Sequence, residues 1–120
     1  MRILLVDDNF ELLELYKDYF EDLGAQCYPC LSALDALEFL EAGHKTDIVI
    51  SDVRLPELTG EEFANIVKLK FNLPIILMSG DYSRTVFENC DHFLLKPFEF
   101  DTLYSEVLKL TKKPEISLQL

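Results

Sequence analysis

Short apolar runs alternate along the chain with stretches in which apolar residues recur every three or four positions. Five runs predict strands, namely Ile3 to Val6, Ala25 to Cys30, Ile48 to Ile50, Ile75 to Met78 and Phe93 to Leu95. Most of them are apolar throughout rather than alternating, which is typical of strands that helices cover on both faces. Pro29 interrupts the second run, and we therefore place that strand at a sheet edge, where a missing N–H costs no ladder bond.

The periodic stretches predict helices. The first spans Phe10 to Leu23, with Asn9 as its N-cap and Gly24 as its stop. We expect its buried stripe to contain Leu12, Leu15, Tyr16, Tyr19 and Leu23. A second helix is capped by Ser32 and ends near Ala42. Its inner residues are expected to be Leu34, Leu37 and Leu40.

Two further helices have equally clear periodicity. One spans Gly60 to Lys70, and its inner residues are expected to be Phe63, Ile66, Val67 and Lys70. The last begins near Phe100 and continues its apolar stripe at Leu103, Val107 and Leu110. With a short fourth helix between the last two strands, five strands alternate with five helices. This order predicts an α/β fold, a parallel sheet with helices on both faces.

Polar residues follow four of the apolar runs, at the points where the strands end. They are Asp7 and Asp8, Ser51 and Asp52, Ser79 to Asp81, and Lys96. Because the carboxyl ends of parallel strands meet at one edge, we expect three carboxylates, a hydroxyl and an ammonium in one crevice. Crowded carboxylates without His or Cys nearby favour Mg²⁺, which is usually shared with a phosphate. The arrangement indicates aspartyl-phosphate chemistry, with one carboxylate as the nucleophile.

Charge and composition narrow the classes of function. A formal net charge of −11 and a pI near 4.4 argue against direct binding to nucleic acid or to an anionic membrane. The 120 residues, 49% of them hydrophobic, suffice for one compact domain. No run approaches the roughly 20 apolar residues of a membrane span, and the N-terminus does not resemble a signal peptide. Three cysteines fit a reducing compartment, so we expect a cytoplasmic protein.

Together these residues resemble the receiver domain of two-component response regulators. The resemblance covers roughly residues 2–110 and rests on motifs distributed along the chain. The motifs are Val6-Asp7-Asp8-Asn9, Asp52-Val53-Arg54-Leu55-Pro56, Gly60, Ser79-Gly80 and Phe93-Leu94-Leu95-Lys96-Pro97-Phe98. The family has a flavodoxin-like fold, which implies the strand order 2-1-3-4-5.

The resemblance also implies a phosphoacceptor and a metal site. Asp52 would take a phosphoryl group from a histidine kinase or a histidine phosphotransfer protein. Asp8 and Asp52 would bind Mg²⁺ directly, with Asp7 acting mainly through water. The main-chain oxygen of Arg54 would be a further ligand.

A switch is implied by the same resemblance. Ser79 would move toward the phosphoryl oxygens, Lys96 would pair with them, and Phe93 would turn inward as Ser79 moves. A cis peptide would precede Pro97. The output would be a changed signalling face, so we expect a phosphorylation-controlled signalling domain rather than an enzyme. Only phosphoryl acceptance and slow autodephosphorylation would be self-catalysed.

Two features depart from the family pattern. Only 17 positions separate Ser79 from Lys96, roughly five fewer than expected, or about a turn and a half of helix. We therefore expect a shortened fourth helix near residues 83–88. Arg54 and Asp81 flank the site with opposite charges, and we hypothesise that they gate access of water to the acyl phosphate. The alternative is that both are simply solvated charges.

Domain boundaries follow from the last helix. We assign residues 1–112 to the receiver domain and residues 113–120 to a C-terminal tail that is too short for an output domain. The domain would act on a downstream protein target, or a C-terminal effector domain is missing from it.

The sequence also offers two alternative functions. Cys27-Tyr28-Pro29-Cys30 lies just before a helix, the setting of a thioredoxin-like redox site. That interpretation leaves the carboxylates and Lys96 unexplained. An aspartyl-phosphate hydrolase of the haloacid-dehalogenase type requires a second aspartate two positions after Asp7, where this chain has Asn9.

Overall fold

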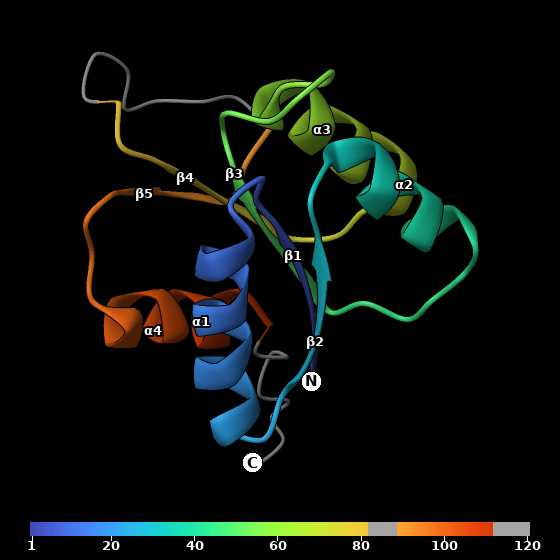
Figure 1. Ribbon diagram of the computed structural model, residues 1–120. Helices are drawn as coiled ribbons and strands as arrows, with labels where there is room; N and C mark the ends of the chain where they lie inside the picture. Colours follow the sequence, from blue (N-terminus) through green and yellow to red (C-terminus); the bar gives the residue numbers. More distant parts are fainter. Residues whose placement is uncertain (82–88, 112–120) are drawn as a thin grey trace, which may run out of the picture.

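The computed structural model describes residues 1–81 and 89–111. One sheet contains the strands β1 (Arg2–Val6), β2 (Gln26–Cys30), β3 (Ile48–Asp52), β4 (Ile75–Ser79) and β5 (His92–Leu95). Its order is β2-β1-β3-β4-β5 and every neighbouring pair is parallel, which confirms the predicted topology (Figure 1).

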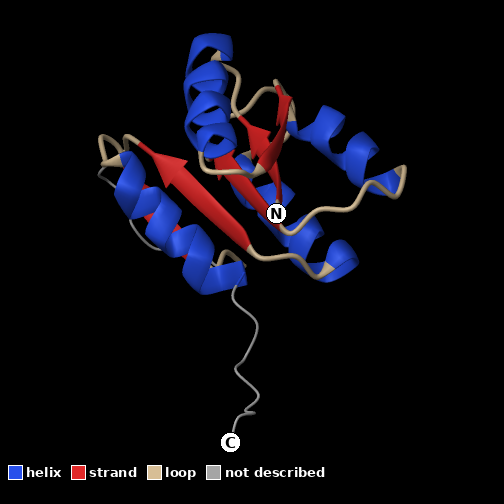
Figure 2. Cartoon of the chain, turned by 90° about the horizontal axis from the view of Figure 1, so that it is seen from below, coloured by secondary structure: helices blue, strands red, loops and turns tan. Residues whose placement is uncertain are grey.

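Helices cover both faces of the sheet. The helices are α1 (Phe10–Asp22), α2 (Ala33–Glu41), α3 (Gly60–Ile66) and α4 (Phe100–Thr111), and α3 continues into a π-helical turn, η1 (Val67–Phe71). Figures 1 and 2 show α1 and α4 on one face and α2 and α3 on the other. The short helix predicted near residues 83–88 lies outside the described residues. None of the helices in the described ranges is long and apolar enough to cross a bilayer.

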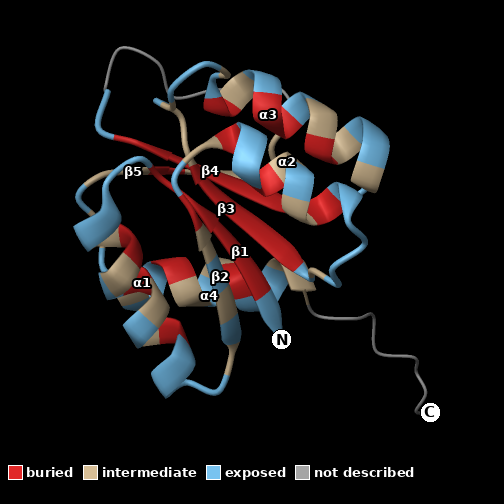
Figure 3. Ribbon diagram, turned by 45° about the vertical axis from the view of Figure 1, so that its right-hand side comes forward, coloured by how far each residue is buried: buried red, intermediate tan, exposed pale blue. Residues whose placement is uncertain are grey.

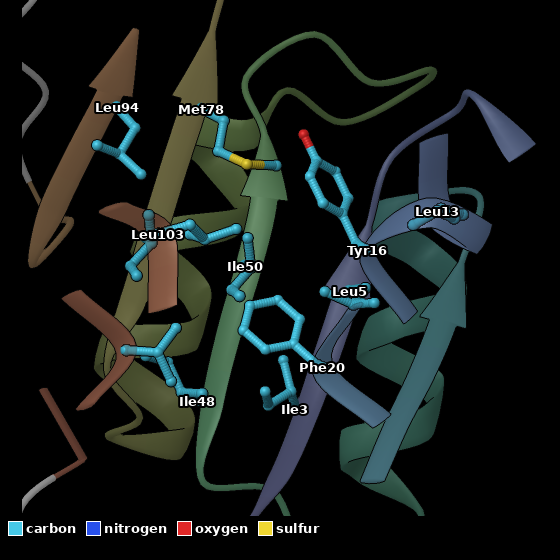
Figure 4. Close-up of a cluster of buried hydrophobic side chains, with 12 residues drawn as sticks. Ile3, Leu5, Leu13, Tyr16, Phe20, Ile48, Ile50, Met78, Leu94 and Leu103 are labelled. Carbon is cyan, nitrogen blue, oxygen red and sulfur yellow. The ribbon is translucent and has the colours of Figure 1, made fainter. Parts of the chain in front are cut away.

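The strands contribute side chains to two cores, one on each face of the sheet, because successive side chains point to opposite faces. Ile3, Leu5 and Ile50 pack with α1 and α4, and Figure 4 shows how Tyr16 and Phe20 of α1 cover them. Leu4 and Val49 belong to the opposite core, under α2 and α3. Figure 3 shows the resulting band of buried residues along the middle of the sheet. Burial on both faces explains why the strands are apolar throughout.

The predicted inner face of α1 is only partly correct. Tyr16 is buried, and Leu12 and Tyr19 pack against the core, as predicted. Leu13 and Phe20 are buried instead of Leu15 and Leu23, which are 54% and 47% exposed. Apolar residues cover two adjoining stripes of this helix at the same spacing, so periodicity alone does not choose between them. Packing against the sheet selects the stripe of Leu13, Tyr16 and Phe20.

The predicted inner face of α2 is also only partly correct. Leu40 is buried as expected, but Leu34 is 47% exposed, and the remaining buried positions are Ala33 and Ala36. Small side chains let the helix lie close to the sheet, so volume rather than hydrophobicity decides which residues face inward.

The remaining helices follow the prediction more closely. Phe63 and Val67 are buried as expected, but Lys70 is exposed and forms an ion pair with Glu41 of α2. In α4, Leu103 and Val107 are buried and Leu110 packs at the margin of the core. The predicted N-caps are confirmed, because the side chains of Asn9 and Ser32 accept the N–H of Leu12 and Asp35, each at 3.1 Å.

The edge position of β2 is confirmed, and its backbone hydrogen bonds explain why Pro29 is tolerated. Gln26 N–H donates to Met1 O, and Cys30 O accepts Asp7 N–H, so alternate residues of β2 face β1. Pro29 lies between them and faces outward. Its missing N–H therefore removes no hydrogen bond from the sheet and leaves the outer edge with fewer donors.

One carboxylate fixes the entry of the chain into β5. Asp91 Oδ2 accepts the N–H of Ile75 at 2.8 Å, and Asp91 N–H donates to Ile75 O at 2.9 Å. Lys68 Nζ, from η1, lies 3.0 Å from each Asp91 carboxylate oxygen. Asp91 thus joins β4, β5 and η1.

Removal of the Asp91 carboxylate should therefore cost more stability than removal of Lys68. We expect Asp91→Ala to lower the free energy of unfolding by about 1–3 kcal/mol, because the partly buried Ile75 N–H loses its acceptor. Lys68→Met should cost only about 0–1 kcal/mol, since it removes a partly solvated charge pair. Urea denaturation measures both values, and equal losses would contradict the assignment of the larger share to the backbone bond.

Candidate functional site

The carboxyl ends of the strands bring the predicted site residues together. Asp7 and Asp8 follow β1, Asp52 ends β3, Ser79 ends β4 and Lys96 follows β5. The Lys96 ammonium lies 3.5 Å from a carboxylate oxygen of Asp7 and 3.5 Å from one of Asp52. A cavity of about 450 Å³ opens beside this pair and is lined by Asp52, Arg54, Ser79, Gly80, Asp81 and Lys96.

The three carboxylates are close enough to share one cation. One oxygen each from Asp7, Asp8 and Asp52 lie within 4.8 Å of one another. Asp7 is 1% exposed; its Oδ1 accepts the N–H of Asn9 at 2.9 Å, but its Oδ2 has no hydrogen-bond partner among the described residues. Burial raises the pKa of the Asp7 carboxyl, and the nearby Asp52 adds to this effect. A buried, incompletely satisfied carboxylate in an all-oxygen cluster fits a hard divalent ion.

Backbone hydrogen bonds hold Asp52 and the segment after it. Val53 N–H donates to Met78 O at 2.9 Å, and Gly60 N–H donates to Val53 O at 2.8 Å. The buried Ser51 hydroxyl donates to Asp52 O at 2.9 Å. Sequence reasoning missed the contribution of Ser51, because a serine inside a strand carries no signal that its hydroxyl bonds a neighbouring carbonyl.

The proposed switch residues occupy neighbouring strands. The buried Ser79 accepts the N–H of Asp81 on Oγ at 3.0 Å, and its carbonyl accepts the N–H of Lys96 at 2.8 Å. Phe93 is half-buried against the core under α2 and α3. The Lys96–Pro97 peptide is cis, as the family resemblance implied.

Tyr16 approaches the site from α1, although its position in a helix stripe marked it only as a core residue. Its ring lies parallel to Phe98 at 6.5 Å and edge-on to Phe100 at 5.6 Å. Figure 4 shows its hydroxyl directed toward the carboxyl ends of the strands. Burial, together with the charges of Asp7 and Asp52, raises the pKa of the Tyr16 phenol. The phenol therefore stays protonated beside the carboxylates.

Arg54 and Asp81 face each other at the mouth of the cavity. Arg54 Nη2 lies 3.9 Å from Asp81 Oδ2, and the two side chains are 82% and 43% exposed. A contact of this length between solvated side chains contributes little to stability. We therefore expect the pair to affect how readily water enters the cavity rather than how stable the fold is.

The two cysteines of the possible redox motif do not face each other. Cys27 packs beside the core under α1, while Cys30 is buried in the core under α2 and α3. Residues three apart in a strand point to opposite faces. Burial raises the pKa of each thiol to about 12, the reverse of what a reactive cysteine needs. The structure therefore does not support the thioredoxin-like alternative.

Comparisons with known proteins point to one family. A family model described as the response regulator receiver domain matches residues 3–108. The heme response regulator HssR of Staphylococcus saprophyticus is 29% identical over 120 residues, which cover 96% of this chain and 53% of that protein. The two-component response regulator ARR11 of Arabidopsis thaliana is 34% identical over 119 residues, covering 91% of this chain and 23% of that protein.

Solved structures agree. The response regulator protein TrrA of Thermotoga maritima, in complex with Mg²⁺ and BeF, is 33% identical, with a TM-score of 0.81. The alignment covers 91% of this chain and 97% of that one. The chain spans about half the length of HssR and less of the plant regulator. No comparison supports the redox or hydrolase alternative.

The close approach of Gly60 to the Asp52 backbone yields a stability prediction. A Cβ at residue 60 would lie 2.3 Å from Asp52 O, whereas one at Gly80 would meet nothing within 4 Å. Gly60→Ala should therefore lower the free energy of unfolding by about 1–3 kcal/mol, the usual cost of overpacking. Gly80→Ala is the matched control and should change it by less than about 0.5 kcal/mol. Thermal or urea unfolding gives both values; equal stability of the two variants would show that the loop relaxes without cost.

Proposed function

This chain belongs to the response regulator receiver domain family of two-component signalling, and we propose that it receives a phosphoryl group on Asp52. The observation that carries the proposal is the meeting of Lys96 with two carboxylates at the carboxyl edge of the sheet. Lys96 Nζ lies 3.5 Å from Asp52, and the cavity beside them is open to a phosphoryl donor.

We propose Mg²⁺ as the cofactor, held by Asp8, Asp52 and the main-chain oxygen of Arg54, with Asp7 acting mainly through water. Three carboxylates around one point, with a buried oxygen of Asp7 lacking a hydrogen bond, support this proposal. When bound, the ion neutralises charge on the phosphoryl oxygens.

The proposed transfer uses a carboxylate oxygen of Asp52 as nucleophile. It forms a bond to phosphorus while the bond from phosphorus to an imidazole nitrogen of the donor breaks, and that nitrogen retains the electron pair and takes up a proton. Lys96, on the same side as the carboxylates, would stabilise the added phosphoryl charge. The donor class is a histidine kinase or a histidine phosphotransfer protein.

The signal would leave the site through Ser79 and Phe93. Phosphorylation adds about 1.5–2 negative charges and three acceptor oxygens. The Ser79 hydroxyl can turn from Asp81 N–H toward such an oxygen, and the half-buried Phe93 can follow into the vacated space. The domain, assigned to residues 1–112, would then act on a downstream protein or effector domain as a cytoplasmic signalling unit rather than an enzyme.

Phosphorylation at Asp52 is tested by intact mass. Incubation with acetyl phosphate and Mg²⁺ should add one phosphoryl group to the wild-type chain, and both Asp52→Asn and chelation of Mg²⁺ should abolish the gain. Asp22→Asn is the matched control, because Asp22 is an exposed carboxylate at the far end of α1. A phosphoryl group that persists on Asp52→Asn would refute the assignment.

We further propose that Arg54 and Asp81 gate the acyl phosphate. Both residues line the cavity beside Asp52, and their charged groups approach within 3.9 Å at its mouth. A pair in this position can restrict attacking water without contributing to stability.

Loss of the gate should change the lifetime of the phosphoryl group and leave the fold intact. We expect Arg54→Ala to shorten the half-life of phosphorylated Asp52 by about threefold or more, which corresponds to about 0.7 kcal/mol at the barrier. Asp81→Ala should shorten this half-life to a similar extent. The double variant should shorten it little further, because either single substitution already removes the gate. If Arg54→Ala changes neither the half-life of the phosphoryl group nor the thermal stability, the gate hypothesis is wrong and the two residues are simply solvated charges.

A further inference from the structure

A second cavity lies at the end of the sheet opposite to Asp52. It has a volume of about 290 Å³ and is bounded by the starts of β1 and β2 and by the loop that leads into β3. The residues that matter here are Arg2, Gln26, Tyr28, Phe39, His44 and Lys45. Among residues 1–81 and 89–111, no carboxylate lines it, although 22 of the 120 residues of the chain are Asp or Glu.

Within the described part of the chain, no carboxylate forms an ion pair with the two positive charges of this cavity. Six of the eight lysines and arginines in the described residues form an ion pair with a carboxylate. The remaining two, Arg2 and Lys45, both line this cavity. Asp47 is close by, but its carboxylate accepts the backbone N–H of Arg2 at 2.7 Å. In a chain of net charge −11, these two cations make the cavity a local exception to the negative charge.

Three aromatic rings form one wall of the cavity. Tyr28 of β2 stacks on Phe39 of α2 with ring centres 4.1 Å apart, and Phe39 stacks on His44 at 4.4 Å. The interplanar angles are 24° and 14°, so the three rings form a continuous ladder. Tyr28 is 51% exposed, which leaves aromatic surface available to a planar ligand.

Hydrogen bonds hold the charged and aromatic groups in place. Arg2 Nε donates to Gln26 Oε1 at 3.1 Å, which orients the guanidinium and leaves its terminal N–H groups to a ligand. The Thr46 hydroxyl donates to His44 O at 3.3 Å and closes the loop that carries His44 and Lys45. The cavity is therefore largely organised before any ligand binds.

We propose that this cavity binds a small molecule in which a planar ring is joined to a phosphate, the chemistry of a nucleoside monophosphate. The phosphate would lie between Arg2 and Lys45, and the ring would pack against the ladder at Tyr28. The volume, close to the roughly 300 Å³ at the lower end of ligand pockets, admits one ring and one phosphate rather than a dinucleotide. The site uses none of the groups around Asp52.

The test is a titration of the full chain, in buffer without divalent cations, with AMP and CMP as probes and amide chemical shifts as the readout. We expect saturable shifts confined to the neighbourhood of Tyr28 and Lys45. Adenosine and inorganic phosphate, which each supply half of the ligand, should bind at least about tenfold more weakly, since each lacks about 1.4 kcal/mol or more of contact.

Substitutions distinguish binding in this cavity from non-specific attraction of anions to the protein. The double variant Arg2→Gln with Lys45→Gln should weaken the binding of AMP at least about tenfold. Tyr28→Leu should weaken it about fivefold or more. The control for loss of charge is Lys109→Gln, which removes one positive charge, against two in the double variant, from a lysine that is ion-paired on α4. Both Lys109→Gln and Asp52→Asn should bind AMP like the wild type.

The proposal would be overturned if neither nucleotide saturates the shifts, if inorganic phosphate binds as tightly as AMP, or if the double variant binds AMP like Lys109→Gln. Because the shifts are mapped on the wild-type chain, the first two results are independent of how any variant folds. Loss of AMP binding in Asp52→Asn would place the ligand at the phosphoacceptor edge instead.

Discussion

A buried carboxylate at the end of β1 is the constraint on which the site depends. Asp7 is almost fully removed from water, and one of its oxygens lacks a hydrogen bond within the described residues. Burying such a charge is costly unless cations are near it. Lys96 Nζ, 3.5 Å from Asp7 Oδ2, partly compensates the charge. A divalent ion among these carboxylates would relieve the repulsion between them, which is why this cluster is suited to a cation.

The parallel sheet makes this crowding unavoidable. Strands β1, β3, β4 and β5 all end at one edge, so the groups that follow them are delivered to one place, whatever their separation along the chain. Close backbone packing then tightens the arrangement: Gly60 lies against Asp52 O, and Val53 bonds to Met78 O in the neighbouring strand. Asp52 is therefore placed by hydrogen-bonded strands, whereas the exposed side chains of Arg54 and Asp81 form the mouth of the cavity.

Charge is distributed differently at the two ends of the sheet. The carboxyl edge gathers three aspartates around one lysine, whereas the cavity at the opposite edge is lined, among the described residues, by two cations and no carboxylate. Between them lie strands buried on both faces. The apolar core therefore separates the carboxylate cluster from the two cations and limits their mutual neutralisation.

The sequence by itself determined the caps at Asn9 and Ser32, the edge position of β2 and the meeting of Asp7, Asp52 and Lys96. These follow from local hydrophobicity, backbone chemistry and the geometry of parallel sheets, whereas the strand order was implied by the resemblance to the receiver family. Only the tertiary structure decided which stripe of α1 is buried, because Leu15 and Phe20 are equally apolar and differ only in what they pack against. The same holds for Arg2 and Lys45: proximity across separate segments depends on how loops pack, which no local pattern records.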